Sequence, residues 1–311
     1  MKRVLLTGAT GFIGRHCLRS LAAGGFDEIH AVSSRDAEEA GREVGSELTA
    51  QVRWHRANLL VEEQTKELIA RARPTHLLHM AWYAEPGKYW TAPINREWLD
   101  QSVALFRAFV EHGGERAVAA GTCAEYDWNY ECCSELSTPL APSTLYGQCK
   151  RALHEQLESL AKDAGTSVAW GRIFFLYGPH EHPQRLVASV ILALLRGEPA
   201  RCTHGRQVRD FLHVQDVADA FVALLQSETT GPVNIASGEP AALRDVVMEI
   251  GRQLRREELI SLGALPAPAN DPARLVADVR RLGKNVGWSS RYDLAAGLAD
   301  TINWWQQRSL K

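Results

Sequence analysis

Short apolar runs alternate with longer amphipathic stretches along the first part of the chain. The apolar runs predict buried strands at residues 4–6, 28–35, 51–59, 75–82, 116–123 and 167–179. Stretches with one apolar face predict helices directly after the first strand and at 61–74, 95–114 and 145–165. Strands and helices that alternate at this spacing predict an α/β fold with a doubly wound parallel sheet.

The pattern loosens after the sixth predicted strand, where short apolar runs, prolines and loops follow. A strand at 232–237 and a helix at 243–256 are still predicted there. We expect a first domain over residues 1–178, to which segments near 208–237 return, and a smaller α/β domain built mainly from residues 179–311. The two parts have no low-complexity linker between them, and the chain shows no internal repeat.

The composition is ordinary for a soluble globular protein. The chain has 311 residues, of which 45% are hydrophobic and 23% charged, and its formal net charge is −2. This charge does not favour electrostatic binding of nucleic acid, so an anionic ligand would need local arginines. The longest apolar run, residues 186–195, is too short to span a bilayer, and glycines interrupt the N-terminal apolar run too early for a signal peptide.

The six cysteines include no CxxC pair. The adjacent Cys132 and Cys133 match neither a zinc site nor a disulfide framework. We therefore expect a reduced, soluble, cytoplasmic protein without a membrane partner.

A glycine-rich loop follows the first predicted strand. Gly8, Gly11 and Gly14 lie in "TGATGFIG" and precede a helix. Glycines allow a tight turn and a close approach of the backbone to a pyrophosphate, and the helix N-terminus offers free N–H groups to that anion. A plain turn with a helix cap is the alternative, but the repeated βαβ pattern favours a dinucleotide site. We expect Phe12 and Ile13 of the same loop to contact the cofactor.

The end of the second predicted strand indicates which dinucleotide is bound. An acidic residue there would bind the ribose hydroxyls of NAD. The chain has Ser33, Ser34 and Arg35 instead. Two hydroxyls and a guanidinium suit a 2′-phosphate, so NADP(H) is the expected cofactor and NAD the less favoured one. A solvated surface turn is the alternative. Further cofactor contacts are expected from Asn58, Leu59 and Ala81, with Asn58 at the adenine edge.

A tyrosine and a lysine four positions apart lie at the start of a predicted helix. Tyr146 and Lys150 therefore share one helix face. A nearby ammonium favours phenolate and would lower the tyrosine pKa from about 10, so that Tyr146 could exchange a proton near neutral pH. Thr122, at the end of the fifth predicted strand, would bind a substrate oxygen beside it. A YxxxK pattern alone occurs by chance, but the glycine loop and Thr122 favour the catalytic interpretation.

With these motifs, the chain resembles the extended short-chain dehydrogenase/reductases, in the epimerase/dehydratase branch that acts on nucleotide sugars. The resemblance covers nearly the whole chain. It rests on "TGATGFIG", "GTCAEY", "YGQCK", "RIFFLYGP", "VRDFLHVQDVADA", "VNIASGE" and the ending "NVGWSSRYDLAAGLADTINWW". It implies an NAD(P)-binding Rossmann domain, a C-terminal domain that binds a nucleotide sugar, and a homodimer formed by helices at 95–112 and 145–164.

The resemblance also assigns individual residues. Thr122, Tyr146 and Lys150 match the catalytic residues of the family, and Arg209 matches an arginine that contacts the nucleotide diphosphate. Two positions depart from the pattern. Asn58 stands where the family usually has aspartate, and Trp98 stands near the place of a helix asparagine. We expect these departures to alter the fine geometry of cofactor binding.

Residues 178–185, "GPHEHPQR", are expected to line the substrate site. His180 matches the acid of family members that both epimerise and reduce a keto sugar, but the accompanying cysteine is one residue early, at Cys123. We therefore expect substrate contacts from His180, Arg185 and Cys123. A metal site is not expected, because this loop spacing is not a recognised ligand set. A solvated loop histidine is the alternative for His180.

Aromatic residues follow the fourth predicted strand, where substrate and nicotinamide should meet. Trp82 is expected to contact the substrate, with Tyr83, Tyr89 and Trp90 nearby. Core packing is an equal alternative for these side chains.

The favoured function is NADPH-dependent reduction of a 4-keto 6-deoxy nucleotide sugar. "GTCAEYDW" and "TPLAPSTLYG" also resemble reductases that complete CDP- or dTDP-linked deoxysugars. Dehydratases of the family carry an acidic pair after the catalytic threonine, whereas this chain has Cys123 and Ala124, and Glu125 is expected to face the other side of the strand. The alternatives are an epimerase with a tightly bound cofactor, a bifunctional epimerase-reductase and a non-catalytic NADP sensor.

Overall fold

A seven-stranded parallel sheet forms the centre of the protein. The computed structural model describes residues 1–45, 51–267 and 271–309. The sheet has the order β11-β7-β5-β4-β1-β2-β3. Its strands are β1 (Arg3–Thr7), β2 (Glu28–Ser33), β3 (Val52–Arg56), β4 (His76–His79), β5 (Arg116–Thr122), β7 (Ser167–Ile173) and β11 (Gly231–Ile235). The predicted doubly wound α/β fold is confirmed by this order and by the helices on both faces.

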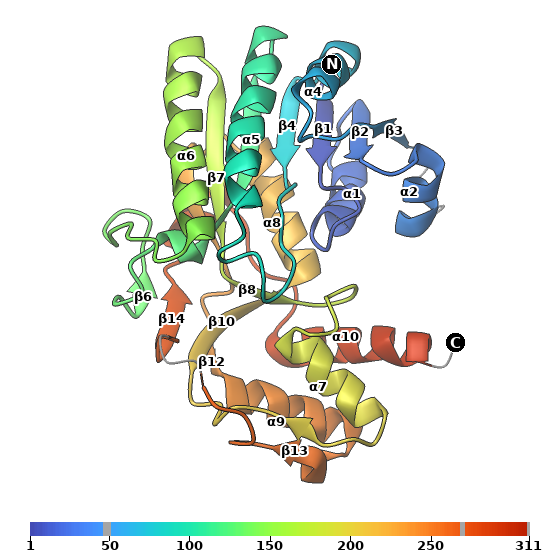
Figure 1. Ribbon diagram of the computed structural model, residues 1–311, viewed down its shortest axis with the longest axis vertical. Helices are drawn as coiled ribbons and strands as arrows, with labels where there is room; N and C mark the ends of the chain where they lie inside the picture. The colour runs from blue at the N-terminus through green and yellow to red at the C-terminus, as the bar shows by residue number, and fades with distance from the viewer. Residues whose placement is uncertain (46–50, 268–270, 310–311) are drawn as a thin grey trace.

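Helices cover the two faces of this sheet (Figure 1). One face carries α4 (Glu62–Ala72), α5 (Ile94–Glu111) and α6 (Leu145–Ala164). The other face carries α1 (Gly14–Ala23) and α8 (Val214–Gln226), while α2 (Ala37–Val44) packs beside β3. The helix α8 follows residue 178 in the chain, yet it packs on α1 and on the main sheet.

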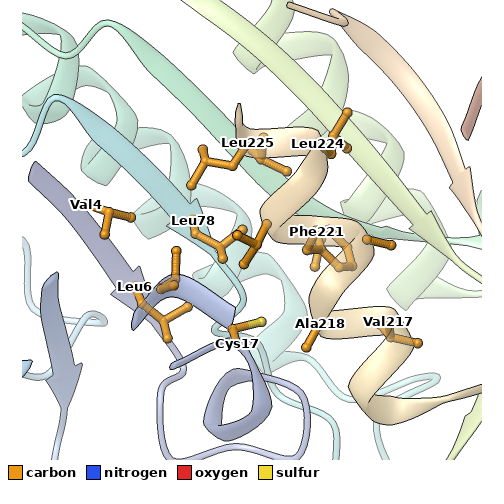
Figure 2. Close-up of a cluster of buried hydrophobic side chains, with 14 of the residues drawn as sticks. Val4, Leu6, Cys17, Leu78, Val217, Ala218, Phe221, Leu224 and Leu225 are labelled. Carbon is orange, nitrogen blue, oxygen red and sulfur yellow. The ribbon is translucent and has the colours of Figure 1, made fainter. Parts of the chain in front are cut away.

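The core between α1, α8 and the sheet is built from continuous apolar strand segments. Val4, Leu6 and Leu78 point from β1 and β4 toward Cys17 of α1 and Phe221 of α8 (Figure 2). All five side chains have no exposed surface. Strands of a parallel sheet are buried on both faces, which explains why these runs lack the polar alternation of a one-sided strand.

A second, smaller sheet lies below the main one (Figure 1). Its strands run in the order β12-β10-β14-β6, and β8 pairs with β10. They are β6 (Cys132–Cys133), β8 (Phe175–Tyr177), β10 (Val208–His213), β12 (Pro240–Ala242) and β14 (Arg274–Ala277). The remaining elements are α7 (Leu186–Leu195), α9 (Leu243–Leu254), α10 (Leu294–Ser309), the pair β9 (Ala200–Arg201) and β13 (Ile260–Ser261), and the short helices η1 (Cys123–Glu125), η2 (Glu257–Leu259) and η3 (Leu282–Val286).

The most apolar run of the chain forms α7. Val187, Val190, Ile191 and Leu194 are buried in it against α9 and α10. No helix in the described residues is long and apolar enough to cross a membrane.

Several predicted strand ends are wrong. The strands β2, β3 and β4 end at Ser33, Arg56 and His79, two or three residues before the predicted ends. The run at 167–179 is not one strand, because the chain leaves the main sheet after Ile173 and β8 pairs with β10 of the second sheet. The N–H of Phe174 donates to the carbonyl of Ile235, 3.2 Å away, at the last contact with the main sheet. The run at 116–123 ends at Thr122, and Cys123 begins η1.

We predict that Phe221→Ala lowers the free energy of unfolding by about 3–5 kcal/mol, because it leaves a cavity under α8 that rigid neighbours cannot fill. Urea denaturation followed by circular dichroism measures this change. Leu136→Ala is the matched control, since Leu136 is 79% exposed and its loss should cost less than about 0.5 kcal/mol. Equal destabilisation by the two variants would contradict the assignment of the core.

Candidate active site

The glycine loop between β1 and α1 has no room for side chains. A Cβ on Gly14 would lie 2.0 Å from the Gly8 carbonyl oxygen, and one on Gly8, where φ is +67°, would lie 2.8 Å from the Ala81 nitrogen. No side chain caps the N-terminus of α1, and the N–H groups of Arg15 and His16 donate to the carbonyls of Gly11 and Ile13. An anion here would therefore be bound by N–H groups that precede Arg15. This loop contains all of the predicted phosphate-loop residues: Gly8, Gly11, Phe12, Ile13 and Gly14.

A buried hydrogen-bond network fixes the ends of β1 and β4 beside this loop. Thr7 Oγ1 lies 2.8 Å from His79 Nδ1 and accepts the N–H groups of Met80 and Ala81 at 3.1 Å each. Burial and the nearby Lys150 charge lower the pKa of His79 to about 3. The neutral imidazole therefore holds the backbone that faces the phosphate loop.

The end of β2 presents a hydroxyl and a guanidinium to solvent. Ser34 and Arg35 are exposed, and Ser33 is buried, with its hydroxyl accepting the Arg35 N–H at 3.1 Å. The next residue is acidic, but the Asp36 carboxylate accepts the N–H groups of Glu38 and Glu39 at the start of α2. The carboxylate nearest to this strand end is therefore used as a helix cap.

Three further residues that we expect to contact the cofactor lie at the ends of β3 and β4. Asn58 is exposed, and its side-chain oxygen accepts the Leu60 N–H at 3.1 Å. Leu59 and Ala81 are buried. Contacts of Asn58, Leu59 and Ala81 with the adenosine part of the cofactor remain a prediction.

The structure brings Thr122, Tyr146 and Lys150 together at the carboxyl end of β5. The side chain of Thr144 caps α6, so Tyr146 and Lys150 lie in its first two turns. The Thr122 hydroxyl lies near enough to the Tyr146 phenol to act as a hydrogen-bond donor that lowers the pKa of that phenol. The buried Lys150 ammonium donates to the carbonyl oxygen of Ala120, 2.8 Å away. A carbonyl placed against the two hydroxyls would meet both a proton donor and a second hydrogen-bond donor.

Burial governs the pKa values of this pair. It raises the pKa of the Tyr146 phenol, although the hydrogen bond from Thr122 opposes this effect. It also lowers the pKa of Lys150 to about 7. The direction for Tyr146 is the opposite of the predicted one, because desolvation of the phenolate is the larger effect in this structure.

Aromatic rings enclose Tyr146 on one side. The rings of Tyr89 and Trp90 stand edge-on to it, with centroids 5.0 and 5.9 Å away. The Tyr146 N–H donates to the Trp90 carbonyl at 3.1 Å. Trp128 stands edge-on to Trp90 at 6.2 Å. These rings limit the access of water to the phenol.

Trp82 contacts the catalytic lysine. The Lys150 ammonium lies 3.8 Å from the centroid of its ring, a geometry that stabilises the cation. The indole N–H donates to Asn95 Oδ1 at 2.8 Å, and Trp98 packs on the same indole with centroids 6.1 Å apart. A substrate contact of Trp82 remains a prediction.

The sequence did not predict the role of Asn95, a fully buried amide that holds the aromatic loop. Its Nδ2 donates to the carbonyls of Tyr89 and Ala92, at 2.7 and 2.9 Å. The only sequence signal was a polar residue at the start of an otherwise apolar helix face.

Arg185 lies over the ring of Tyr89, and Glu181 precedes it in the same loop. The Arg185 guanidinium stands 5.7 Å from the Tyr89 ring centroid and lowers the pKa of the Tyr89 phenol against the larger effect of burial. Arg185 is exposed, as expected for a residue that meets an anionic ligand. Glu181 is buried, and burial raises the pKa of its carboxyl to about 8. Its Oε2 has no hydrogen-bond partner among the described residues.

His180 faces the phosphate-loop helix. Its Nδ1 lies 2.6 Å from a guanidinium nitrogen of Arg15, and its ring packs on Trp304 of α10 with centroids 4.5 Å apart. Burial and the neighbouring arginines lower the pKa of His180 to about 3. The neutral ring connects α1 with α10, and its contact with substrate remains a prediction.

Arg209 is almost fully buried in β10. Its guanidinium pairs with Asp271 and donates to the Val208 carbonyl at 2.8 Å, and it lies 5.3 Å from the Phe175 ring centroid. The predicted contact with a diphosphate would have to replace or join the Asp271 carboxylate.

Cys123 and Glu125 lie in η1, directly after Thr122. Burial raises the pKa of the Cys123 thiol. Glu125 was expected on the opposite face of a strand, but η1 turns its carboxylate toward Trp170 and Arg172 on the face of the sheet that α6 covers, where it forms an ion pair with Arg172 at 2.9 Å. The sequence signal that could have indicated this ion pair was Arg172, a charged residue within an otherwise apolar strand. Among the described cysteines, Cys132 is exposed and the others are buried.

Within the described ranges, no group of three or more histidine, cysteine, aspartate or glutamate residues could hold a metal ion.

Known proteins resemble this chain along its whole length. The chain is 27% identical to UDP-glucuronic acid decarboxylase 1 of Xenopus tropicalis over 98% of its own length and 72% of the relative's. The solved structure of MoeE5 in complex with UDP-glucuronic acid and NAD superimposes with a TM-score of 0.82 at 28% identity, covering 98% of this chain and 99% of that one. UDP-glucose 4-epimerase from Thermus thermophilus, in complex with NAD, gives a TM-score of 0.84 at 25% identity over 98% and 99% of the two chains.

The model of one family, the NAD-dependent epimerase/dehydratase family, matches residues 4–236. That range contains the glycine loop, the Thr122–Tyr146–Lys150 group and every strand of the main sheet except the first residue of β1. The chain therefore belongs to the NAD-dependent epimerase/dehydratase family and is an NAD(P)-dependent enzyme of the extended short-chain dehydrogenase/reductase type.

Proposed function

We propose that the protein reduces the 4-keto group of a 6-deoxy nucleotide sugar, with NADPH as the hydride donor. The observation that carries this proposal is the pair of neighbouring hydroxyls, Thr122 and Tyr146, beside the buried Lys150 ammonium. The three side chains lie at the carboxyl end of β5, where ligands bind in a doubly wound sheet.

Thr122, Tyr146 and Lys150 have distinct roles in this reaction. Thr122 donates a hydrogen bond to the keto oxygen, and Tyr146 transfers its proton to that oxygen as the carbonyl carbon becomes a carbinol. The raised pKa of the Tyr146 phenol keeps it protonated before the transfer. NADPH supplies the hydride. The Lys150 ammonium binds the ribose next to the nicotinamide and stabilises the phenolate that remains.

The end of β2 supports NADPH over NADH. The exposed Ser34 hydroxyl and Arg35 guanidinium suit a 2′-phosphate. Asp36, which could otherwise bind ribose hydroxyls, caps α2. The solved relatives named above contain NAD, so this preference would distinguish the protein from them.

Reduction is also favoured over dehydration or decarboxylation. The two residues after Thr122 are Cys123, a buried thiol whose pKa is raised, and Ala124, which cannot exchange a proton. The next carboxylate, Glu125, is bound to Arg172 and Trp170. The site therefore offers proton transfer at one carbonyl, without the second acid that loss of water from neighbouring carbons requires.

Two arginines support a nucleoside diphosphate as the carrier of the sugar. Arg185 is exposed beside Tyr89, and Arg209 enters from the second sheet. A guanidinium binds phosphate through charge-assisted hydrogen bonds. We further propose that two copies associate through α5 and α6.

Epimerisation is the second candidate, because several relatives are named UDP-glucose 4-epimerase, among them that of Rhizobium meliloti at 25% identity over 98% of this chain. A panel of 4-keto nucleotide sugars with NADPH separates the two. Stoichiometric loss of absorbance at the wavelength of the reduced cofactor supports reduction. A changed sugar without net oxidation supports epimerisation.

Tyr146→Phe should lower turnover by about 10²–10⁴-fold and leave cofactor affinity unchanged, because it removes only the transferable proton. Steady-state kinetics and fluorescence titration with NADPH measure the two quantities. Lys150→Met should lower both turnover and affinity. Near-normal turnover of the phenylalanine variant would reject Tyr146 as the proton donor.

Wild-type protein should bind NADPH more tightly than NADH, and Arg35→Ala should weaken NADPH binding by about 10–100-fold because it removes a charge-assisted hydrogen bond. Titration with both cofactors tests this, and NADH affinity serves as the internal control. Equal wild-type affinities, or a parallel loss for both cofactors, would contradict the proposal.

The enzyme should not release water from dTDP-, CDP-, GDP- or UDP-hexoses in the presence of NADP⁺ or NAD⁺, because no free carboxylate adjoins Thr122. Mass spectrometry of the products detects a 4-keto-6-deoxy sugar directly. Catalytic formation of that product from any of the four would overturn the proposed reaction.

A further inference from the structure

Glu125 is a buried carboxylate whose hydrogen bonds join three parts of the site. It has no exposed surface. Oε1 accepts the Thr122 N–H at 2.8 Å and the Trp170 indole N–H at 2.9 Å. Oε2 accepts the Arg172 Nε–H at 2.9 Å and the same indole N–H at 3.1 Å. None of these partners is expected to transfer a proton.

We propose that Glu125 is a positioning residue, which orients Thr122 through its backbone N–H and stabilises the Lys150 ammonium from the same face of the sheet, the face that α6 covers. It contacts neither substrate nor reacting atoms. It acts through two residues that do.

The position of Thr122 depends directly on this carboxylate. The side chain of Thr122 accepts the Ala124 N–H at 3.2 Å, and its backbone N–H donates to Glu125, so η1 closes as a capping box. The preceding residue is Gly121, where a Cβ would lie 2.1 Å from the Trp170 indole nitrogen and 2.7 Å from Glu125 Oε1. The carboxylate therefore packs tightly against the strand end that carries the catalytic hydroxyl.

Trp170 connects the carboxylate with the lysine. Its indole N–H binds both oxygens of Glu125, and the Lys150 ammonium lies 6.0 Å from the centroid of its ring. Burial of Lys150 favours the neutral amine, whereas the Glu125 charge opposes this effect. In a low-dielectric environment, a nearby carboxylate favours the charged form of an ammonium and raises its pKa.

Arg172 orients the carboxylate. Its Nη1 donates to the Tyr126 hydroxyl at 3.0 Å, and that hydroxyl donates to Asn234 Oδ1 at 2.7 Å. None of these four residues has a fully buried side-chain polar atom without a hydrogen-bond partner among the described residues, which is the condition under which a buried ion pair is tolerated.

Two substitutions separate the two roles. Glu125→Gln keeps an oxygen for the Thr122 N–H and removes the charge. Glu125→Asp keeps the charge and is too short to reach the same N–H. Glu135→Gln is the matched control, because Glu135 is partly buried nearby and binds the Asn234 N–H, without contact to Thr122 or Lys150.

Titration of the Lys150 side chain is the decisive measurement. The ¹³Cε chemical shift is followed against pH in protein labelled with ¹³C-lysine, and the spectrum of Lys150→Met assigns the signal. We expect the midpoint to fall by about 1 pH unit in Glu125→Gln. It should remain at the wild-type value in Glu125→Asp and Glu135→Gln.

Turnover of a 4-keto nucleotide sugar gives the second readout. Glu125→Asp should lose about 10²-fold in kcat, because a shift of about 1 Å in Thr122 misplaces the carbonyl. Glu135→Gln should retain wild-type kcat. An unchanged Lys150 midpoint in Glu125→Gln, or wild-type kcat in Glu125→Asp, would overturn the inference.

Arg172 loses its counter-charge in Glu125→Gln, so folding is checked by thermal unfolding. If that variant does not fold, Glu125→Gln combined with Arg172→Gln removes both buried charges. The Lys150 midpoint should fall in the double variant as well, and an unchanged midpoint there would equally overturn the inference.

The inference rests on the proposed function only for the roles of Thr122, Tyr146 and Lys150. The lysine titration needs no turnover. A lowered midpoint in a protein that is inactive toward every keto sugar would reject the proposed reaction and leave the electrostatic role of Glu125 in place.

Discussion

A buried ion pair between Glu125 and Arg172 is the constraint on which the geometry of the site depends. Such a pair contributes little net stability, because the cost of removing two charges from water is comparable to the attraction between them. The ion pair instead fixes the position of the strand end that carries Thr122. The carboxylate accepts from Thr122, Trp170 and Arg172, so a displacement of the strand end would leave a buried charge with unmade hydrogen bonds.

The order of the strands brings the two halves of the site to one edge. The strand order of the sheet reverses between β1 and β4. Ligands of doubly wound sheets bind at such a topological switch point. Gly8 and Ala81 lie there in close contact, and Thr122 follows on the neighbouring strand β5. The second sheet receives the chain through β8 and extends below the main sheet (Figure 1), and its strand β10 carries Arg209.

Features that depend on local spacing were predictable from the sequence. The glycine loop lies between one strand and one helix, and Tyr146 and Lys150 are four residues apart on a helix that Thr144 caps. Their assembly with Thr122 follows from the parallel order of the strands. The cofactor and substrate contacts assigned to other residues remain predictions.

Features that depend on distant partners were not predictable. The role of Glu125 requires Trp170 and Arg172, which are 45 and 47 residues away in the chain, and it requires β5 to end one residue earlier than its apolar pattern indicates. His180 has a left-handed backbone with φ of +71° and meets Arg15 from the other end of the sequence. Neither contact has a periodic signature, because both arise from the packing of separate elements.

The exposure of the cysteines directs chemical labelling to one site on the protein. Only a thiolate attacks an alkylating reagent, and burial keeps the Cys123 thiol protonated. Cys132 is the exposed cysteine among the described residues, and it lies on β6, paired with β14. This pairing connects the segment that follows η1 with β14. The strand β14 begins shortly after Asp271, which forms an ion pair with Arg209. A maleimide fluorophore would therefore be directed to β6, the edge strand of the second sheet.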